Sequence, residues 1–510
     1  HRGTYTSQAR TKKGNRKCEL ALRDAEMWSA IAAASKGFDI PADRLHDAWR
    51  ELLLNQFHDI LPGSSIHRVY EEAEAGFART LAVAEATTAA ATAALTRGRK
   101  DLTVFNSLNW ERTELVALPA GAAGATGRDG KPLPCQRFGS AVLAEVTVPG
   151  CGWTTITPGG PRARVRNRLK ADRRTLENDL IRLRLNDRGE IESLYDKQAE
   201  RELAAGTCNV MRMYKDVPGS YDAWDIDTSY RCCPVELGEP AELDVVAAGP
   251  LLAAIRVRRT LHNSSMTQEI RLRRGSRRVD FVTTVDWRER HKLLKVCFPV
   301  RYHADEAVHE IQFGHVRRPN HYSRQFDADR FEVCNHKWSA LVEQARGFAV
   351  LNDCKYGLNV LGDTINLTLL RSPLAPDETA DQGVQEFTYS IFPWNGSLAE
   401  SDVVRQGYEL NVPVRTACGS AGAGSILTVD APNIVIESVK PAEDGGGDVI
   451  VRLYECKRTA TRCELTIHLP VVGLSQTDML ERDGQEIELR GRRAKLSFRA
   501  FEIKTLRLKM

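Results

Sequence analysis

Apolar and polar residues at the start of the chain recur with the spacing of helices. Residues 7–35 are rich in Ala, Leu, Arg, Lys and Glu, and the pattern stops before Gly37, a residue type that often ends helices. Pro41 opens a second predicted helix that runs to about Ile60, where Pro62-Gly63 interrupts the pattern. The sequence therefore predicts two helices before this break.

A third predicted helix follows the break. Ser64 or Ser65 can cap it, and it continues through an Ala-rich stretch to Gly98. Its apolar residues lie four apart and form one stripe, at Val69, Ala73, Phe77 and Leu81. Helices of this length with short connections predict an antiparallel three-helix bundle over residues 1–98.

After Lys100 the helical spacing gives way to short β-type runs separated by turns rich in Gly, Pro, Asn and Asp. Examples are residues 102–105, 142–148, 180–185, 268–272, 279–285, 293–300, 365–370 and 463–469. Strands without intervening helices predict antiparallel sandwiches rather than a parallel α/β sheet.

The expected fold class is α+β multidomain, with a three-helix bundle followed by mainly antiparallel β-sandwich domains. We place the bundle at residues 1–98 and a small β domain at 99–160. A large β-sandwich would occupy 161–395, and a C-terminal β-sandwich 396–510.

Charge and composition narrow the class of protein. The 510 residues carry 71 Lys and Arg against 67 Asp and Glu, a formal net charge of +4. That charge is too small for a protein whose main partner is nucleic acid. The sequence lacks a run of about 18 apolar residues, so we expect no membrane-spanning helix. The chain opens on His1 with neither a Met nor a secretory signal, and we expect it to be the interior of a longer protein.

The twelve cysteines are scattered, with no CxxC pair and no zinc-finger spacing. Free thiols in a reducing compartment fit this usage, and we expect a cytoplasmic location. A secreted protein with a few disulfides is the alternative. Three Asn-x-Ser/Thr sequons would permit glycosylation in that case, at Asn263, Asn366 and Asn395.

One segment places polar residues inside an apolar, helix-like run. Asn55, His58 and Asp59 interrupt residues 51–66, and on an ideal helix they fall within a sector of about 100°. A neutral imidazole can bind a metal ion, and a carboxylate can accept hydrogen bonds from a substrate. A single His is more often structural, and one His cannot make a metal site without further ligands.

This segment, LNQFHDILPGSSI at residues 54–66, resembles the signature of glycoside hydrolase family 38, the zinc-dependent retaining α-mannosidases. Further similar blocks cover most of residues 1–395 and are most similar to the bacterial and cytosolic branch of the family. The blocks are residues 1–9, 12–16, 216–218, 221–225, 285–295, 330–338, 351–357, 370–373 and 386–389.

The resemblance implies roles for the His-Asp pair. His58 would be one of four zinc ligands, and Asp59 would contact bound mannose, with support of His58 as the alternative role for Asp59. The family's other ligands and its nucleophile lie in an N-terminal α/β domain, which we expect upstream of His1. We therefore expect no catalytic residue in this chain and no hydrolysis by it alone. The family's upstream ligands include a His-x-Asp pair. The only His-x-Asp of this chain, at residues 303–305, lacks the family's surroundings and is interpreted as a surface coincidence.

The second candidate site is the block around Trp224. Asp222 and Asp225 flank this ring, and carboxylates can accept hydrogen bonds from sugar hydroxyls while an aromatic ring stacks on the sugar face. The alternative is an acidic loop fixed by a buried Trp. Which of the two roles applies stays open at the level of sequence.

Four further positions follow from the resemblance. Arg371 and Asp381 match family positions, and for them we favour a structural salt bridge. Related sequences carry His where this chain has Gln385 and Trp394. If those His residues touch substrate, the specificity of this protein differs.

Together these features predict part of a zinc-dependent retaining α-mannosidase that removes terminal α-linked mannose from oligosaccharides in mannan metabolism. The expected cofactor is Zn²⁺, with another divalent metal such as Co²⁺ as an alternative. The expected partners are a mannose-containing oligosaccharide and the N-terminal catalytic domain of the same protein, with a homo-oligomer left open. Two rival interpretations are a carbohydrate-binding or accessory β-sandwich module without catalysis, and a structural scaffold.

Overall fold

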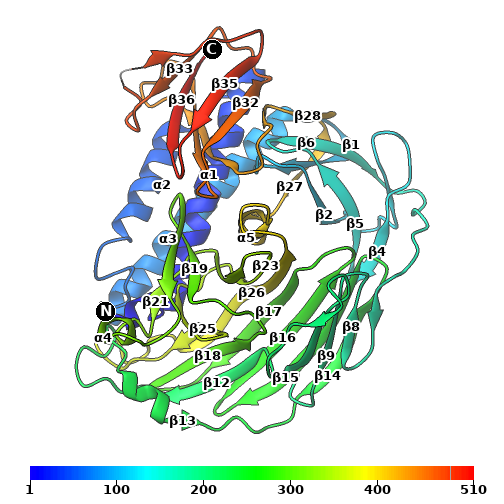
Figure 1. Ribbon diagram of the computed structural model, residues 1–510. Coiled ribbons are helices and arrows are strands. Elements are labelled where there is room, and N and C mark those ends of the chain that lie inside the picture. The colour runs from blue at the N-terminus through cyan, green and yellow to red at the C-terminus, as the bar shows by residue number, and fades with distance from the viewer. Residues whose placement is uncertain (483) are drawn as a thin grey trace. The chain divides into compact units, whose positions relative to one another are not determined.

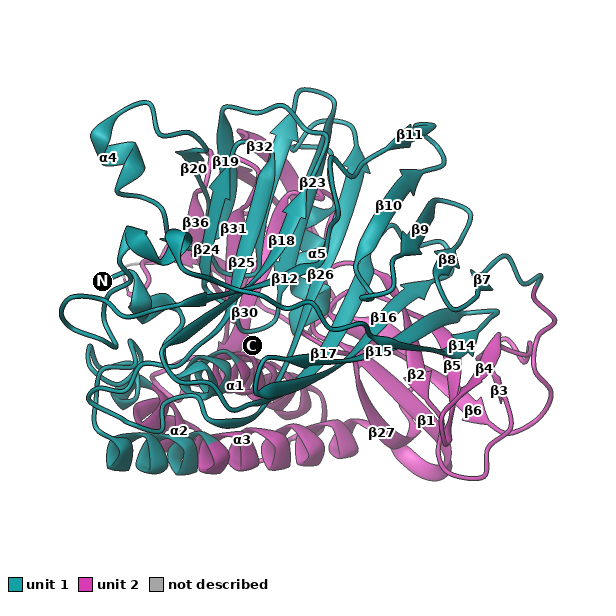
Figure 2. Cartoon of the chain, turned by 90° about the horizontal axis from the view of Figure 1, so that it is seen from below, with its two compact units in different colours: residues 1–16, 53–77, 166–411 teal, residues 17–52, 78–165, 412–510 magenta. Residues whose placement is uncertain are grey.

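The computed structural model describes residues 1–482 and 484–510. The described chain forms two compact units, and each is assembled from segments that are far apart in sequence (Figure 2). Unit 1 comprises His1–Arg16, Leu53–Phe77 and Arg166–Asn411; unit 2 comprises Lys17–Leu52, Ala78–Val165 and Val412–Met510. The domain boundaries expected from the sequence stay a prediction.

Long helices occupy the start of the chain and strands most of the rest (Figure 1), which confirms the predicted α+β fold class. The long helices are α1 (Ala9–Lys36), α2 (Ala42–Leu54) and α3 (His67–Leu95). Gly37, at φ +66°, ends α1 as predicted, because this left-handed conformation suits glycine. The short helices are η1 (Gly3–Tyr5), η2 (Thr228–Cys232), α4 (Gln325–Ala328) and α5 (Val403–Asn411).

Contacts between the long helices confirm the predicted bundle. Trp49 Nε1 on α2 donates a 2.9 Å hydrogen bond to Glu26 Oε1 on α1. Arg79 on α3 forms an ion pair with Glu51 on α2. Helix α1 also approaches α3 closely at Gly14, where any Cβ would collide with a Phe ring of α3.

Unit 1 contains a longer and a shorter antiparallel sheet. The longer sheet consists, in spatial order, of β14 (Glu242–Ala248), β15 (Leu252–Leu261), β16 (Ser264–Arg273), β17 (Val279–Trp287), β26 (Gly383–Asn395), β23 (Arg346–Asn352), β22 (Trp338–Glu343), β19 (Glu306–Ile311) and β20 (Gly314–Pro319). The shorter sheet consists of β13 (Pro234–Val235), β12 (Val210–Lys215), β18 (Lys292–Pro299), β25 (Thr364–Arg371), β24 (Gly357–Leu361) and β21 (Val333–Cys334).

These sheets share one apolar core because alternate residues of their strands point inward. On β17, every second residue from Val279 to Trp287 is buried, the two-residue period of a strand. Phe281 of β17 packs 4.9 Å from Tyr389 of β26 and 6.1 Å from Phe298 of β18, between ring centroids. The aromatic contacts therefore join the longer sheet to the shorter one, as in a β-sandwich.

A further sheet of unit 1 adds its buried residues to the same core. Its strands are, in order, β11 (Arg201–Glu202), β10 (Ile191–Asp196), β9 (Ile181–Leu185), β8 (Thr175–Glu177) and β7 (Lys170–Ala171). On β9, Ile181, Leu183 and Leu185 are fully buried, whereas the arginines between them are exposed. This alternation again gives the strand one apolar face.

Unit 2 holds the remaining sheets of the described residues. One sheet consists of β27 (Arg415–Ser420), β1 (Arg97–Asn106), β6 (Gly152–Pro158), β28 (Ala423–Ser425) and β3 (Ala125–Thr126), and a second of β2 (Arg112–Ala117), β5 (Ala141–Val148) and β4 (Cys135–Phe138). The C-terminal sheets are β29 (Leu427–Val429), β32 (Thr461–Ile467) and β35 (Arg493–Phe498), and then β30 (Ile434–Pro441), β31 (Val449–Glu455), β36 (Ile503–Lys509), β33 (Gly473–Thr477) and β34 (Gln485–Glu486).

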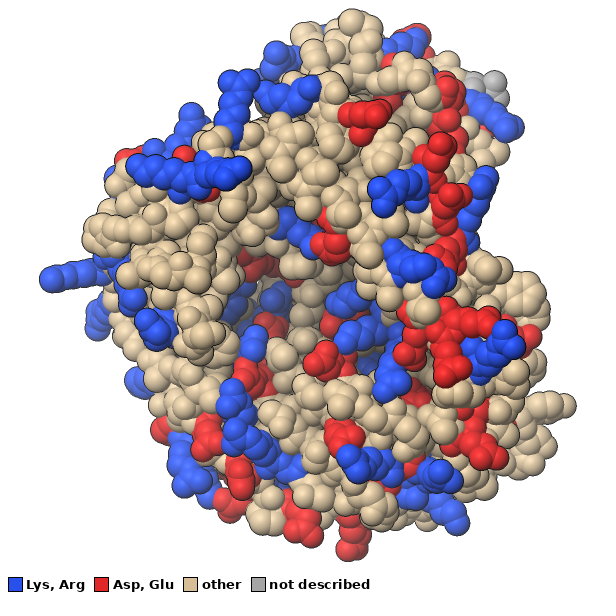
Figure 3. Space-filling view, turned by 180° about the vertical axis from the view of Figure 1, so that it is seen from behind, with Lys and Arg blue, Asp and Glu red and all other residues tan. Residues whose placement is uncertain are grey.

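The surface carries charges of both signs. Figure 3 shows Lys and Arg interspersed with Asp and Glu over the visible face, as the net charge of +4 leads one to expect. None of the helices in the described part of the chain combines the length and the apolarity needed to cross a bilayer.

Candidate functional site

The candidate segment at residues 55–63 is a series of turns and not the end of a helix. Helix α2 stops at Leu54, so the prediction that this helix runs to about Ile60 was wrong. Asn55, His58 and Asp59 therefore do not lie on one face of a helix. The backbone N–H groups of Phe57 and Ile60 donate to carbonyls three residues back, at 3.1 and 3.0 Å, which tightens the chain beyond an α-helix.

His58 projects into solvent from these turns. Its side chain is 73% exposed, and its Nε2 lies 3.3 Å from Oδ2 of Asp59, which is 43% exposed. The ring of Phe57 lies 4.3 Å from the imidazole centroid, and Phe57 is itself exposed. Ser64 donates a 3.2 Å hydrogen bond from Oγ to the other carboxylate oxygen of Asp59. The imidazole is thus open to a ligand, and the position of Asp59 suits both of its predicted roles.

The donors at this turn fit zinc chemically but are too few to hold it. Imidazole nitrogen and carboxylate oxygen are ordinary zinc ligands, and a zinc site needs three or four of them from the protein. Across residues 1–482 and 484–510, no group of three or more His, Cys, Asp and Glu side chains comes together. His303 and Asp305, the one His-x-Asp of the sequence, are both exposed at the surface.

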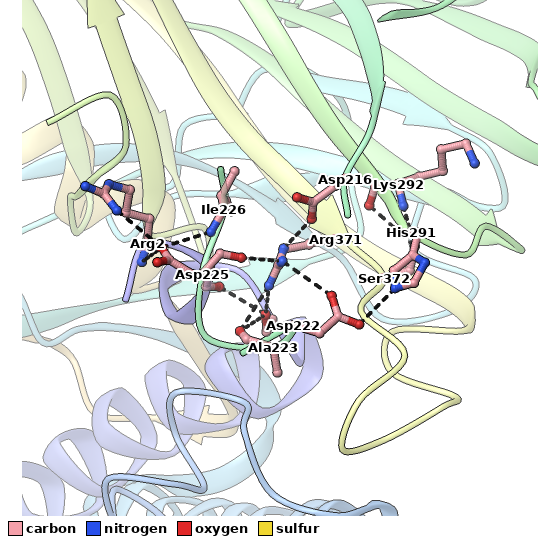
Figure 4. Close-up of polar contacts among 12 residues, drawn as sticks. Arg2, Asp216, Asp222, Ala223, Asp225, Ile226, His291, Lys292, Arg371 and Ser372 are labelled. Atoms are coloured by element: carbon pink, nitrogen blue, oxygen red, sulfur yellow. Dashed lines mark hydrogen bonds and ion pairs between the residues drawn. The ribbon is translucent and has the colours of Figure 1, made fainter. Parts of the chain in front are cut away.

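The block around Trp224 is a loop tied down by Arg371 (Figure 4). Arg371 is fully buried and donates from Nε to Oδ2 of Asp216 at 2.6 Å. Its other nitrogens donate to the carbonyl oxygens of Ala223 and Asp225, at 3.0 and 2.5 Å. Burial raises the pKa of Asp216, while the guanidinium opposes that shift. The favoured structural salt bridge therefore exists for Arg371, with Asp216 as its partner.

The carboxylate of Asp222 faces the protein. Its Oδ2 accepts hydrogen bonds from His291 Nε2 at 2.9 Å and from the backbone N–H groups of Leu374 and Ala375, at 2.7 and 3.3 Å. Figure 4 shows the side chain pointing from its loop toward His291. Three donors already bind this oxygen, so Asp222 fixes the loop whatever else it contacts.

Asp225 and Trp224 lie nearer the surface. Asp225 Oδ1 accepts from the N–H of Ile226 at 3.0 Å and from Arg2 at 3.3 Å. Partial burial raises the pKa of Asp225, but these hydrogen bonds outweigh it and hold the pKa below its ordinary value. Trp224 is only half-buried and stacks on the exposed Tyr221, with ring centroids 5.9 Å apart. The alternative prediction was an acidic loop held in place by a buried Trp. The loop is held in place by Arg371 instead, and Trp224 is only half-buried.

Three family-matched positions lie inside the fold. The sequence suggested a structural salt bridge for Asp381, but this buried residue does not pair with Arg371. Its carboxylate accepts hydrogen bonds from the backbone N–H groups of Gln8 and Ala9, at 2.8 and 2.6 Å. Burial raises the pKa of Asp381 to about 6. Gln385 and Trp394 are also buried.

Sequence reasoning assigned no role to Lys12 beyond its place in the family-like block 12–16. In the structure its Nζ donates to carbonyl oxygens at the end of the His58 turn. The two partners lie 49 and 50 residues apart from it, and no local pattern links them.

Three family models match the chain in order. They are the alpha mannosidase middle domain at residues 1–95, the glycosyl hydrolases family 38 C-terminal domain at 176–379, and the family 38 C-terminal beta sandwich domain at 433–506. His58 falls within the first of these matches and the Trp224 loop within the second. The order of these matches is that of the middle and C-terminal domains of glycosyl hydrolase family 38.

Curated relatives and solved structures agree with the matches. Alpha-mannosidase 2C1 of Homo sapiens is 39% identical over 531 residues, which cover 100% of this chain and 50% of that protein. Alpha-mannosidase G of Dictyostelium discoideum is 32% identical over 573 residues, covering 99% and 52%. The crystal structure of an alpha-mannosidase from Enterococcus faecalis V583 shares the fold, with a TM-score of 0.85, 19% identity and coverage of 99% and 68%.

The chain belongs to glycosyl hydrolase family 38 and carries the middle and C-terminal domains of its α-mannosidases. It spans about half the length of the curated relatives it matches.

Proposed function

We propose that this chain is part of a zinc-dependent retaining α-mannosidase that hydrolyses terminal α-linked mannose from oligosaccharides in mannan metabolism. The observation that carries the proposal is the exposed imidazole of His58, beside the Asp59 carboxylate, in a turn that falls within the middle-domain match. The relatives are named alpha-mannosidases, which supports the substrate class.

In this proposal, His58 supplies one metal ligand and Asp59 accepts a hydrogen bond from a mannose hydroxyl. Zn²⁺, or a related ion such as Co²⁺, would bind sugar hydroxyls and act as a Lewis acid. The remaining ligands and the two carboxyl groups that a retaining glycosidase requires would come from an N-terminal catalytic domain of the same protein. Asp222, Trp224 and Asp225 would shape a loop for sugar recognition.

The test uses the full-length protein with an aryl α-mannoside and a zinc measurement. His58→Ala should lower zinc affinity by more than about 100-fold and abolish hydrolysis, because zinc ligands are few and each is essential. His46→Ala is the matched control, since His46 is also an exposed His on the preceding helix. Full activity and normal zinc content in His58→Ala would refute the assignment. Residues 1–510 alone should neither hydrolyse the substrate nor bind zinc tightly.

A carbohydrate-binding module without catalysis is the second candidate. The exposed Tyr221, which stacks on the half-buried Trp224, favours it, because aromatic faces bind sugar rings. Calorimetry with a mannose oligosaccharide would separate the two functions: a pure binding module binds it through Trp224 and is insensitive to His58→Ala.

We also propose a reducing, cytoplasmic location. All twelve cysteines lie in the described residues and are free, and unpaired thiols are typical of such a compartment.

A further inference from the structure

Lys12 lies at the end of the first turn of α1 with its ammonium group buried. The side chain is only 4% exposed. Its Nζ donates to the carbonyl oxygens of Ser7, Leu61 and Pro62, the last two at 2.9 and 3.4 Å. An ammonium has three N–H bonds and no acceptor, so these three carbonyls match its full donor set. Two of the three belong to the turns that begin at His58.

The same turns touch residue 7 a second time. Gly63 has φ +95°, and a Cβ there would lie 2.5 Å from the carbonyl oxygen of Ser7 and 2.8 Å from its Cβ. Only glycine permits both the conformation and this approach. The end of the turn is therefore packed directly on the backbone that precedes α1, and Lys12 bridges the two.

The other end of the turn is held by hydrogen bonds to the carbonyl oxygen of Asp59. Ser65 Oγ donates to it at 2.7 Å, Tyr70 OH at 3.2 Å and the N–H of Ser64 at 3.2 Å. Residues 60–62 are held by backbone hydrogen bonds within the turns and, from α1, by the hydrogen bonds of Lys12 to Leu61 and Pro62. Lys12 reaches them with a charged group.

Keeping a charge at this place is unfavourable in itself. Burial lowers the pKa of Lys12 to about 7, and the nearby Asp381 carboxylate opposes that shift. An apolar side chain of similar length would fill the space without this penalty, but it would leave the carbonyl oxygens of Leu61 and Pro62 without their donor. The ammonium group therefore serves as the hydrogen-bond donor to these two carbonyl oxygens.

We propose that Lys12 is a positioning residue, which fixes the turn that carries His58 and Asp59 in the conformation that binds the metal ion and mannose. This rests on the proposed function for the metal and sugar, but the clamp itself is a property of the fold. A ligand held in one conformation binds a metal more tightly than one that must be ordered on binding.

The experiment compares Lys12→Met with Lys13→Met in the full-length protein. Lys13 is the neighbouring residue, is partly exposed and makes an ion pair with Glu386 at 3.6 Å, so it controls for loss of a charge from α1. Hydrogen–deuterium exchange of residues 55–66 should accelerate about tenfold in Lys12→Met and stay unchanged in Lys13→Met. Zinc affinity, measured by chelator competition, should fall roughly 10- to 100-fold only in Lys12→Met.

A third variant separates positioning from loss of folding. Lys12→Gln keeps an N–H donor, so residues 55–66 should exchange at a rate between those of wild type and Lys12→Met. If Lys12→Met does not fold, Lys12→Gln still tests the proposal. Exchange of residues 55–66 equal to wild type in both variants would overturn the proposal. Faster exchange in a protein whose zinc content does not depend on His58 would support the clamp and refute the metal site.

Discussion

Arg371 and Asp216 form an ion pair inside unit 1, with the Nε of Arg371 2.6 Å from Oδ2 of Asp216 and both side chains buried. The same guanidinium donates to the carbonyl oxygens of Ala223 and Asp225. One buried cation therefore joins strand β25 to the loop that presents Trp224. Loss of either partner leaves the other charge without compensation in the core.

Arg371→Met should consequently destabilise the protein by about 3–5 kcal/mol. Urea unfolding followed by fluorescence measures the change. Arg288→Met is the control, because Arg288 pairs with Asp286 at the exposed surface and such pairs contribute about 0–1 kcal/mol. Combining Arg371→Met with Asp216→Asn should recover part of the loss. A loss no larger than that of the control would mean that the buried pair is dispensable.

Gly357, the first residue of β24, has no room for a side chain. An added Cβ would meet Glu332 Oε1 at 2.9 Å and would come still closer to the hydroxyl of Thr6. Gly357→Ala should therefore cost about 1–3 kcal/mol of folding free energy through overpacking.

Gly206→Ala is the matched control for Gly357→Ala. Its Cβ would meet only Pro299, at 3.5 Å, an ordinary contact. We expect a change within about 0.5 kcal/mol of wild type in the same thermal or urea melt. Equal effects of the two variants would contradict the assigned close approach.

Glu26 should make stability depend on pH. Burial raises its pKa from 4.5 to about 7, although Lys440 and the hydrogen bond from Trp49 oppose the shift. Between these values the folded state holds a proton that the unfolded state releases, so this contribution is complete below about pH 4.5 and is lost as the pH rises through about 7.

Glu26→Gln can keep an acceptor for Trp49 and removes the titration. We expect it to stabilise the protein by about 1–3 kcal/mol at pH 8 and to leave it nearly unchanged at pH 5. Chemical denaturation at both pH values measures this. Glu72→Gln, at an exposed position of α3, should show no such difference. A uniform effect of Glu26→Gln at both pH values would contradict the proton uptake.

The thiols should separate into two kinetic classes. Cys232, Cys233 and Cys418 are exposed, whereas Cys334 is half-buried and the others are buried. Burial also raises the pKa of thiols such as Cys18, to about 12, which suppresses the reactive thiolate. We expect three thiols to react rapidly with an aromatic disulfide reagent and the rest only after unfolding. A total below twelve in denaturant would reveal disulfides instead.

Local patterns predicted the elements whose structure is set locally. Gly37 ends α1 because its conformation is decided within a few residues, and the alternation on β17 is visible in the sequence for the same reason. The end of α2 was missed because residues 55–60 contain neither Gly nor Pro, and the first such helix-breaking residue is Pro62. What stops them includes Lys12, which holds Leu61 from 49 residues away.

The candidate site shows the same division. The His58–Asp59 pair could be named from its motif, but its exposure and its turn conformation depend on contacts with the start of α1. The sequence left open whether Asp222 contacts a sugar or belongs to a structural loop. Its direction is set by His291 and by backbone donors about 150 residues further along the chain. The sequence was enough to name the candidate residues. The direction of each side chain depends on contact residues far away in the sequence, which only the structure shows.

The chain alternates between the two units in six segments, and this order has a consequence during synthesis. The N–H of Gln8 binds Asp381, 373 residues later. At about 5–20 residues per second, the ribosome delivers that partner only after tens of seconds. Helix α1 can form early, but its first turn waits for most of the protein to emerge. Unit 2 waits longer still, because Val412–Met510 arrives last.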